Sequence, residues 1–353
     1  MANWVLPMQQ TFEYYKVDPG TWCDTEQVHS VISSTITRDS GAATLGSLSL
    51  KTTESIDECY IRVYMVINQN GIREKHPLGT FLIQSPSIDF NGKYNTVAID
   101  GYTPLIELKE NYPPYGYHLL KKENIMDIAY RLVRENARAP VVETESTKTL
   151  TNNFIADISD TWLTYIASLI YNADYELGLD ELSRIIFSKK QELYALRPKW
   201  TYNDDNSSIL YPSVSFTQDL YGIPNVVEVI YSNGRECIMT KATNKTKNSP
   251  TSTVSRGRTI THRITSPEIY GNPTKEQLTE YAEKMLRELS SLECSVTYTH
   301  GYCPVRLGDC VRLNYSKAGI NNVKAKVIYQ SIECKPGCPV TEKAIFTTEL
   351  WKG

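Results

Sequence analysis

The sequence predicts a β-rich α+β fold, in which a β segment at each end of the chain flanks a smaller α+β segment. Three observations predict it. Alternation of apolar and polar residues dominates residues 1–105 and returns from residue 209. A helical period is confined to the middle of the chain and to one long stretch near the C-terminus. Tyrosine, with 24 residues against 7 phenylalanines, suits half-buried strands because its ring packs while its hydroxyl finds a polar partner.

Residues 1–105 form the first expected domain. The run YIRVYMVINQNG alternates and stops at a turn, and GTFLIQSPSIDFNGKYNTVAID supplies two more strands around NGK. An earlier strand, in ITRDSGAATLGSLSL, is broken by Gly41 and Gly46. Because no helical period of useful length precedes residue 105, we expect this domain to be built of strands.

Residues 106–208 form the expected α+β domain. Residues 124–137 place their apolar side chains on one helical face, with Asn124 as a candidate N-cap. Residues 159–172 repeat this pattern around Trp162. The run ADYELGLDELSRIIFSKK follows, and it predicts two strands joined by an Asp-Glu turn.

Residues 209–353 form the second expected β domain, and they contain one long amphipathic helix. The runs ILYPSVSFT and NVVEVIYSNG predict strands. Residues 274–293 predict the helix, because Pro273 precedes it and Thr274 with Gln277 makes a capping box. Its apolar stripe must be buried, most simply against the sheet that follows. The stripe consists of Leu278, Tyr281, Ala282, Met285, Leu286, Leu289 and Leu292.

A basic segment, residues 237–267, precedes this helix. It holds six Lys or Arg, no Asp or Glu, and twelve Ser or Thr. This composition predicts a solvated basic loop or a long hairpin tip. Two interpretations stay open: a mobile loop, which composition favours, or a contact with an acidic partner or nucleic acid through Arg256 and Arg258.

The charge, the first residues and the lack of a long apolar run argue against several classes of protein. A net charge of −3 argues against a protein whose whole surface binds nucleic acid or anionic lipid. The start, MANWVLPMQQ, has no basic leader, and no apolar run approaches the ~20 residues of a membrane span. We therefore expect synthesis in a reducing cytoplasm, cysteines that begin as thiols, and no insertion into a membrane.

Residues suited to catalysis form no recognisable motif. None of the five histidines lies in an H-E-x-x-H helix, and there is no G-x-S-x-G elbow or phosphate-binding glycine loop. Cys23 lies in a strand or turn, where a structural role is expected. The carboxylates of Asp174, Glu176, Asp180 and Glu181 surround one predicted turn, where solvated acids are common. The sequence therefore predicts a protein that is not an enzyme and requires no cofactor.

Four cysteines near the C-terminus are candidate metal ligands. Cys303 and Cys310 bracket one glycine-containing turn, and Cys334 and Cys338 bracket another. Two turns with two thiolates each could hold a structural zinc or iron ion, with His300 as a substitute ligand. The spacings are not those of C-x2-C knuckles, so the alternative is four small buried apolar side chains. Four protein ligands would make the metal a structural staple, because no position stays open for catalysis.

Several stretches together resemble the baseplate hub proteins of phage tails, the family of the T4 and Mu hub subunits. These are PLGTFLIQSPS, then SDTWLTYIASLIYNADYELGLDELSRIIFSKK, then DLYGIPNVVEVIYSNG, and finally SPEIYGNPTKEQLTEYAEKMLRELSSL followed by CPVRLGDCVRL. Their order and spacing carry the resemblance, since none is diagnostic alone. The four cysteines are not part of the general family pattern.

The resemblance implies two tube-type β-barrel domains per chain and a homotrimer. Three chains would then form a ring that continues a hexameric tail tube and carries a spike below. Its partners would be the tail tube protein, the spike protein and other baseplate proteins, with DNA passing through the lumen without specific binding. The site of action would be the virion tail, or a related bacteriocin-like particle (a tailocin). Two other hypotheses stay open: a tail-associated cell-wall hydrolase, and a zinc-stabilised nucleic-acid-binding protein that uses residues 237–267.

Overall fold

The alternating segments form strands, and strands from both ends of the chain pair in one sheet. The computed structural model describes residues 2–90, 92–93, 95–205, 208–218, 220–232, 236–265, 267 and 273–349. The strands of the large sheet are β1 (Gln9–Val17), β2 (Asp24–Val28), β3 (Val31–Asp39), β4 (Gly46–Thr52), β5 (Tyr60–Gln69), β6 (Ile72–Phe90), β7 (Asn95–Tyr102), β13 (Trp200–Asn203), β14 (Leu210–Gln218), β18 (Ser291–Gly301), β19 (Cys310–Tyr315), β20 (Ile320–Glu333) and β21 (Pro339–Glu349). Their order is β14-β18-β21-β20-β3-β4-β7-β6-β5-β1-β2, and β19 with β13 branches from β20.

Pairing of β20 with β3 joins the two β segments of the chain. The two strands are antiparallel, with Ile332 opposite Ile36 and Tyr329 opposite Asp39. The β-rich α+β fold is therefore confirmed, whereas closure of either β segment into a barrel stays a prediction. Within the described residues, no helix is both long enough and apolar enough to span a bilayer.

By contacts, the chain divides into two compact units. Unit 1 comprises Met1–Val214 and Thr297–Ala344, and unit 2 comprises Ser215–Val296 and Ile345–Gly353. The expected ranges 1–105 and 106–208 thus fall together in unit 1, while 209–353 is shared by both units. Apolar periodicity in the sequence predicts where strands give way to helices. Which segments form one compact unit depends instead on pairing between strands far apart in the chain.

In the first β segment, alternation sets burial strand by strand. Every second residue of β4 is buried, whereas β5 is buried on both faces through most of its length. The predicted break between β3 and β4 is confirmed, since β3 ends at Asp39 and β4 begins at Gly46. A side chain on Gly46 would place its Cβ 2.3 Å from the carbonyl oxygen of Thr37, so only glycine fits there.

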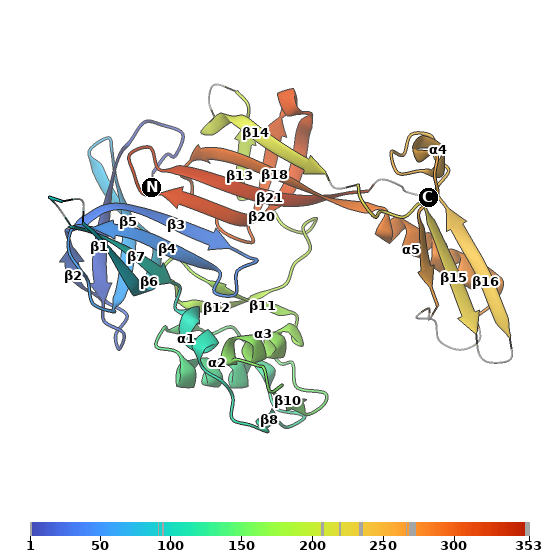
Figure 1. The fold of residues 1–353 in the computed structure, drawn as a ribbon, viewed down its shortest axis with the longest axis horizontal. Coiled ribbons are helices and arrows are strands. Elements are labelled where there is room, and N and C mark those ends of the chain that lie inside the picture. The colour runs from blue at the N-terminus through green and yellow to red at the C-terminus, as the bar shows by residue number, and fades with distance from the viewer. Residues whose placement is uncertain are drawn as a thin grey trace. The chain divides into compact units, whose positions relative to one another are not determined.

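Three helices and two short sheets form the α+β part of unit 1. The helices are α1 (Leu105–Glu110), α2 (Ile125–Asn136) and α3 (Trp162–Tyr171). The strands are β8 (His118–Leu119), β9 (Val141–Val142), β10 (Phe154–Ile155), β11 (Tyr175–Leu179) and β12 (Ile185–Lys189). The helices pack against one another, with β11 against α3 (Figure 1). Asn124 caps α2 as predicted, because its Oδ1 accepts hydrogen bonds from the amides of Met126 and Asp127.

The turn between β11 and β12 anchors this part to the large sheet. The carbonyl of Leu182 accepts hydrogen bonds from Trp22 Nε1 at 3.1 Å and Thr80 Oγ1 at 2.9 Å. Ser183 Oγ accepts a third bond, from the amide of Thr80 at 2.8 Å. The guanidinium of Arg306 donates to the carbonyl of Asp180 at 2.8 Å. The predicted Asp-Glu turn is therefore a hydrogen-bonded junction, in which Ser183 is buried while Glu181 stays exposed.

Unit 2 consists of a three-stranded sheet with a helix on one face. The strands are β15 (Val226–Ser232), β16 (Cys237–Thr243) and β17 (Thr261–Ile264), in the order β16-β15-β17. The helix α5 (Lys275–Leu289) begins at the predicted capping box of Thr274 and Gln277. Its residues Leu278, Ala282 and Leu286 are buried against Val227 and Val229 of β15.

Two expectations for this helix were wrong. It packs on β15 and β16, which precede it in the chain, rather than on the strands that follow. It also ends at Leu289 instead of residue 293, because Ser290 leaves the helical conformation and strand alternation resumes. Leu292, expected on the helix, is a buried residue of β18.

The basic segment 237–267 is largely ordered structure rather than a solvated loop. It contains β16, the short helix α4 (Thr253–Arg256) and β17. Its many Ser and Thr residues form a small buried polar core: Asn244 Nδ2 donates to Ser249 Oγ at 2.9 Å, and Ser249 Oγ lies 3.2 Å from Thr251 Oγ1. These hydroxyls replace an apolar core, which explains why composition suggested a loop.

Candidate assembly surfaces and a buried polar cluster

The most densely connected polar groups of unit 1 lie on the buried faces of four strands. Alternation in β18 places Tyr298 and His300 on its buried face, and Tyr202 comes from β13. Tyr202 Oη lies 3.1 Å from His300 Nε2 and 3.2 Å from Cys303 Sγ. Glu342 of β21 accepts a hydrogen bond from Tyr298 Oη. We call Tyr202, Tyr298, His300, Cys303, Gln330 and Glu342 the buried polar cluster.

The remaining bonds of this cluster satisfy the Glu342 carboxylate. Gln330 Nε2 donates to Glu342 Oε2 at 2.7 Å and to the carbonyl of Val305 at 2.9 Å. His300 Nε2 lies 3.4 Å from the same carboxylate oxygen. Arg38 of β3 donates to Gln330 Oε1 at 2.9 Å, so the cluster extends across the pairing of β20 with β3. A buried carboxylate needs such partners, because an unpaired one would be strongly destabilising.

The cluster favours a protonated imidazole. His300 Nδ1 lies 2.6 Å from the carbonyl oxygen of Gly301, which can only accept, so Nδ1 carries a proton. Burial favours the neutral ring, but the Cys303 sulfur and the Glu342 carboxylate outweigh it and raise the pKa of His300 to about 10. Burial, with the adjacent carboxylate, raises the pKa values of Tyr202 and Tyr298 well above their usual range, so both phenols stay neutral.

Cys303 and His300 superficially match a thiol nucleophile and its base. Their Sγ and Nδ1 atoms are 4.0 Å apart, yet Cys303 is 1% exposed and His300 is 0% exposed. No side of the pair is open to a substrate. The geometry therefore suits a polar staple that holds β13, β18, β20 and β21 together.

The structure does not gather the four candidate cysteine ligands. Cys303 faces Tyr202, whereas Cys310 Sγ lies against the carbonyl of Val311. Cys334 and Cys338 pack together in the apolar core of the first β segment. Cys310 pairs with Lys326, so Cys334 lies eight residues further along the chain, roughly 26 Å in an extended strand. Zinc requires sulfurs about 2.3 Å from one ion, and within the described residues no three His, Cys, Asp or Glu groups could hold a metal.

Each of the four acids considered as catalytic has a structural partner. Asp174 pairs with Lys148, and Glu176 lies 3.6 Å from Lys326. Asp180 accepts bonds from the amides of Leu182 and Arg184 within its turn. Glu181 lies 3.4 Å from Arg306. Cys23 is exposed, and its thiol donates to the carbonyl of Thr21 in a turn.

The two arginines proposed as partner contacts differ in their surroundings. Arg256 donates from NH1 to the carbonyl of Ile223 and from NH2 to the carbonyl of Leu220, each at 2.8 Å. Arg258 is exposed, and within the described part of the chain only its backbone carbonyl is engaged, by Asn225 Nδ2 at 2.9 Å. Arg256 therefore supports the fold of unit 2, whereas the side chain of Arg258 is free to meet a partner.

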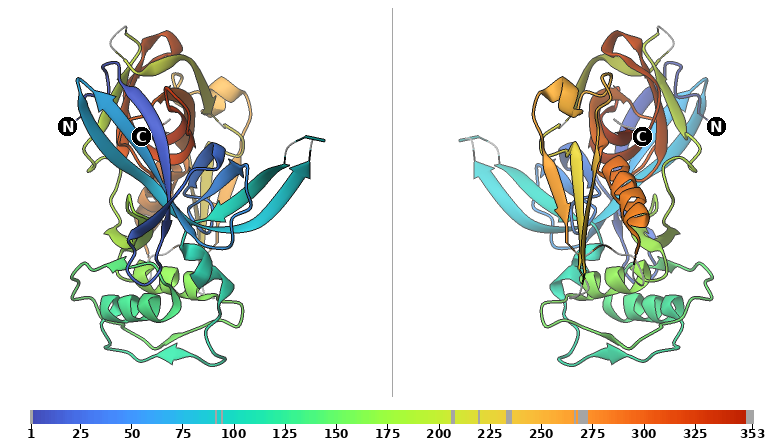
Figure 2. Two further views of the ribbon diagram at one scale, coloured as in Figure 1. Left: turned by 90° about the vertical axis from the view of Figure 1, so that its left-hand side faces the viewer. Right: turned by 90° about the vertical axis from the view of Figure 1, so that its right-hand side faces the viewer.

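The β6–β7 hairpin carries an exposed apolar row. From Pro86 to Phe90 the described side chains of β6 are exposed, and Ile88 and Phe90, on the same face, are 63% and 68% exposed. Figure 2 shows this end of the hairpin, in teal, projecting beyond the neighbouring strands of unit 1. A two-stranded ribbon is marginally stable alone, so such a row is typical of a segment that is covered in an assembly.

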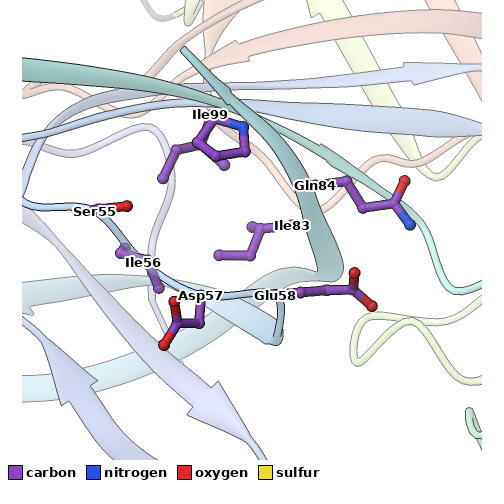
Figure 3. A pocket seen from close by; sticks show the side chains of 8 residues that line it. Ser55, Ile56, Asp57, Glu58, Ile83, Gln84 and Ile99 are labelled. Atoms are coloured by element: carbon purple, nitrogen blue, oxygen red, sulfur yellow. The ribbon is translucent and has the colours of Figure 1, made fainter. Parts of the chain in front are cut away.

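A groove with acidic sides lies at the base of the same hairpin. One hollow of about 450 Å³ is lined by Ile56, Asp57, Glu58, Ile83 and Ile99, among others (Figure 3). A second hollow, of about 560 Å³, shares Glu58 and Gln84 with the first. It adds the acids Glu107, Glu110 and Glu135 and the arginines Arg134 and Arg138. Only Glu107 among these acids has a salt bridge within the described residues, to Arg138.

This fold is shared with solved tail proteins. One, the tail protein from Neisseria meningitidis MC58, is 12% identical with a TM-score of 0.61, and the match covers 96% of this chain and 96% of that one. Another, the 43 kDa tail protein of prophage MuSo2 from Shewanella oneidensis, is 10% identical with a TM-score of 0.59, covering 96% and 98%. No family model matches the sequence, and no curated protein matches it. The predicted resemblance is therefore confirmed at the level of the fold.

Proposed function

We propose that this protein is a structural, non-catalytic hub subunit of a phage tail or tailocin baseplate. In this proposal three copies form a ring that joins the tail tube to the spike and contacts other baseplate proteins, with DNA passing through the lumen. The observation that carries the proposal is the shared fold, which extends over 96% of this chain and nearly all of two tail proteins.

Two features of unit 1 support an assembly role. The exposed row of Ile88 and Phe90 is an apolar surface that a subunit contact would bury. The pair that most resembles a catalytic thiol and base, Cys303 and His300, is buried inside the sheet, which supports a structural role for it.

The decisive experiment is the mass and shape of the purified chain. We expect sedimentation at about 120 kDa, three times the 40.1 kDa of one chain, and rings in negative-stain images. Replacing Ile88 and Phe90 by serine should shift the protein toward monomer without lowering its melting temperature, because neither side chain is part of a core. Ile72→Ser, at an equally exposed position near the other end of β6, is the matched control.

Two results would contradict the proposal. A wild-type chain that stays monomeric at every concentration would exclude the ring. Clearing of a cell-wall zymogram by the purified protein would exclude the non-catalytic role.

A further inference from the structure

Unit 2 carries a basic surface that is not neutralised by acids among its described residues. On the sheet face opposite α5, Glu228 lies between Lys241 and Arg263. Arg263 forms a two-point ion pair with Glu228, at 2.9 and 3.0 Å, so Lys241 is the unbalanced charge of this row. Lys245, Lys247 and Arg258 are exposed in the loops that follow. We call Lys241, Lys245, Lys247 and Arg258 the basic face, and no ion pair joins them to acids among the described residues.

The rest of this face favours a protein partner over nucleic acid. The next row pairs Ile230 with Met239, which is 52% exposed. The rows of this face carry no aromatic ring on which a base could stack, because Tyr231 packs against α5 instead. Lysines next to an exposed thioether suit an acidic surface that also offers apolar contacts.

Such a surface exists on the same chain, in unit 1. The groove described above presents Asp57, Glu58, Glu110 and Glu135. All four are exposed, and none forms an ion pair with a base in the described part of the chain. We call these four residues the acidic groove. Its two arginines, Arg134 and Arg138, each pair with another acid, Glu143 and Glu107 respectively. Its floor includes the side chains of Ile56, Ile83 and Ile99, so it combines negative charge with apolar area.

We propose that the acidic groove of one copy receives the basic face of the next copy, so that the proposed ring is held by head-to-tail contacts. This inference rests on the proposed function. Each chain carries both halves of the contact, and joining two different surfaces of identical chains generates a closed ring when the rotation closes. Opposite unpaired charges favour this pairing over other partners and make it sensitive to salt.

The test is a charge swap measured by sedimentation velocity. Lys245→Glu with Lys247→Glu, or Asp57→Lys with Glu58→Lys, should each weaken association by roughly tenfold or more, since like charges then face each other. The four substitutions combined should restore association, because opposite charges face each other again. Raising NaCl from 50 to 300 mM should weaken the wild-type ring and leave monomer stability unchanged.

Lys275→Glu with Lys284→Glu, on the exposed face of α5, gives the same charge change and should associate like the wild type. The inference is overturned if either reversal associates normally, or if the combined variant stays dissociated. Binding of a 30-base-pair DNA that is lost with Lys245→Glu and Lys247→Glu would also overturn it, by assigning the basic face to nucleic acid. If the wild type is a trimer whose association is unchanged by these charge reversals, only this inference is contradicted. If the wild type is a monomer, the proposed function is contradicted as well.

Discussion

The imidazole of His300 makes stability depend on pH in a direction that can be calculated. Its folded pKa, about 10, lies above its unfolded value of about 6.5. The contribution of the protonated ring is therefore full below pH 6.5 and is lost as the pH rises through 10, on the order of 5 kcal/mol in all. We expect the melting temperature to fall between pH 7 and 10, and His300→Gln to abolish most of that slope.

The carboxylate of Glu342 provides the control for this prediction. His300→Gln leaves it buried without its cationic partner, so this variant should be several kcal/mol less stable at pH 7. Adding Glu342→Gln should recover much of the loss, because the uncompensated charge is then removed. An unchanged pH slope in His300→Gln would show that the ring is neutral in the folded protein.

Substitutions of Arg256 and Arg258 compare an arginine that supports the fold with one whose side chain is exposed. Arg256→Ala removes two hydrogen bonds to backbone carbonyls and should destabilise unit 2 by about 1–3 kcal/mol. Arg258→Ala should leave the melting temperature unchanged and weaken only assembly. Hydrogen exchange of the amides near residues 220–225 reports the first effect, and equal losses of protection in both variants would contradict it.

The candidate metal site shows what residue spacing alone can predict. Both cysteine turns were placed correctly, and Gly337 and Cys338 do adopt positive φ in the second. Spacing says nothing about where two turns lie in a folded sheet, and here the strand register separates them. The buried polar cluster had a weaker signal, the alternation of Tyr298 and His300 in β18. Its partners Tyr202 and Glu342 lie about a hundred and about forty residues away, beyond any local pattern.

At the scale of elements, α5 should govern the stability of unit 2. Leu286 is fully buried between this helix and its sheet, so Leu286→Ala should cost about 2–5 kcal/mol. We expect faster hydrogen exchange in α5, β15 and β16. Glu283→Ala, on the exposed face of the same helix, should change little. Similar effects from both variants would mean that the helix does not depend on this apolar stripe.

Local sequence patterns predicted the helices and strands better than they predicted the contacts between these elements. Capping residues and apolar periodicity located α2, α3 and the start of α5, because these signals are written within a few turns of helix. The same patterns failed in the basic segment, whose core is built of hydroxyl and amide groups. They also assigned α5 to the wrong strands, since an apolar stripe does not specify which sheet will cover it.

For the whole molecule, the pairing of β3 with β20 decides how the two ends of the chain are related. Arg38 and Gln330, which bond across this seam, are 292 positions apart. A sheet that joins so distant a pair has high contact order, and such topologies fold slowly. No short-range signal in the sequence marks this pairing, although the segment of β3 was recognisable as a strand.

That seam also has a consequence during synthesis. A ribosome adds about 5–20 residues per second, so β3 emerges on the order of 15–60 seconds before its neighbour β20. Throughout that interval the nascent chain bears a bare strand edge, the kind of surface on which unfinished polypeptides stick to each other. Chaperones that shield such edges would therefore raise the yield of this protein.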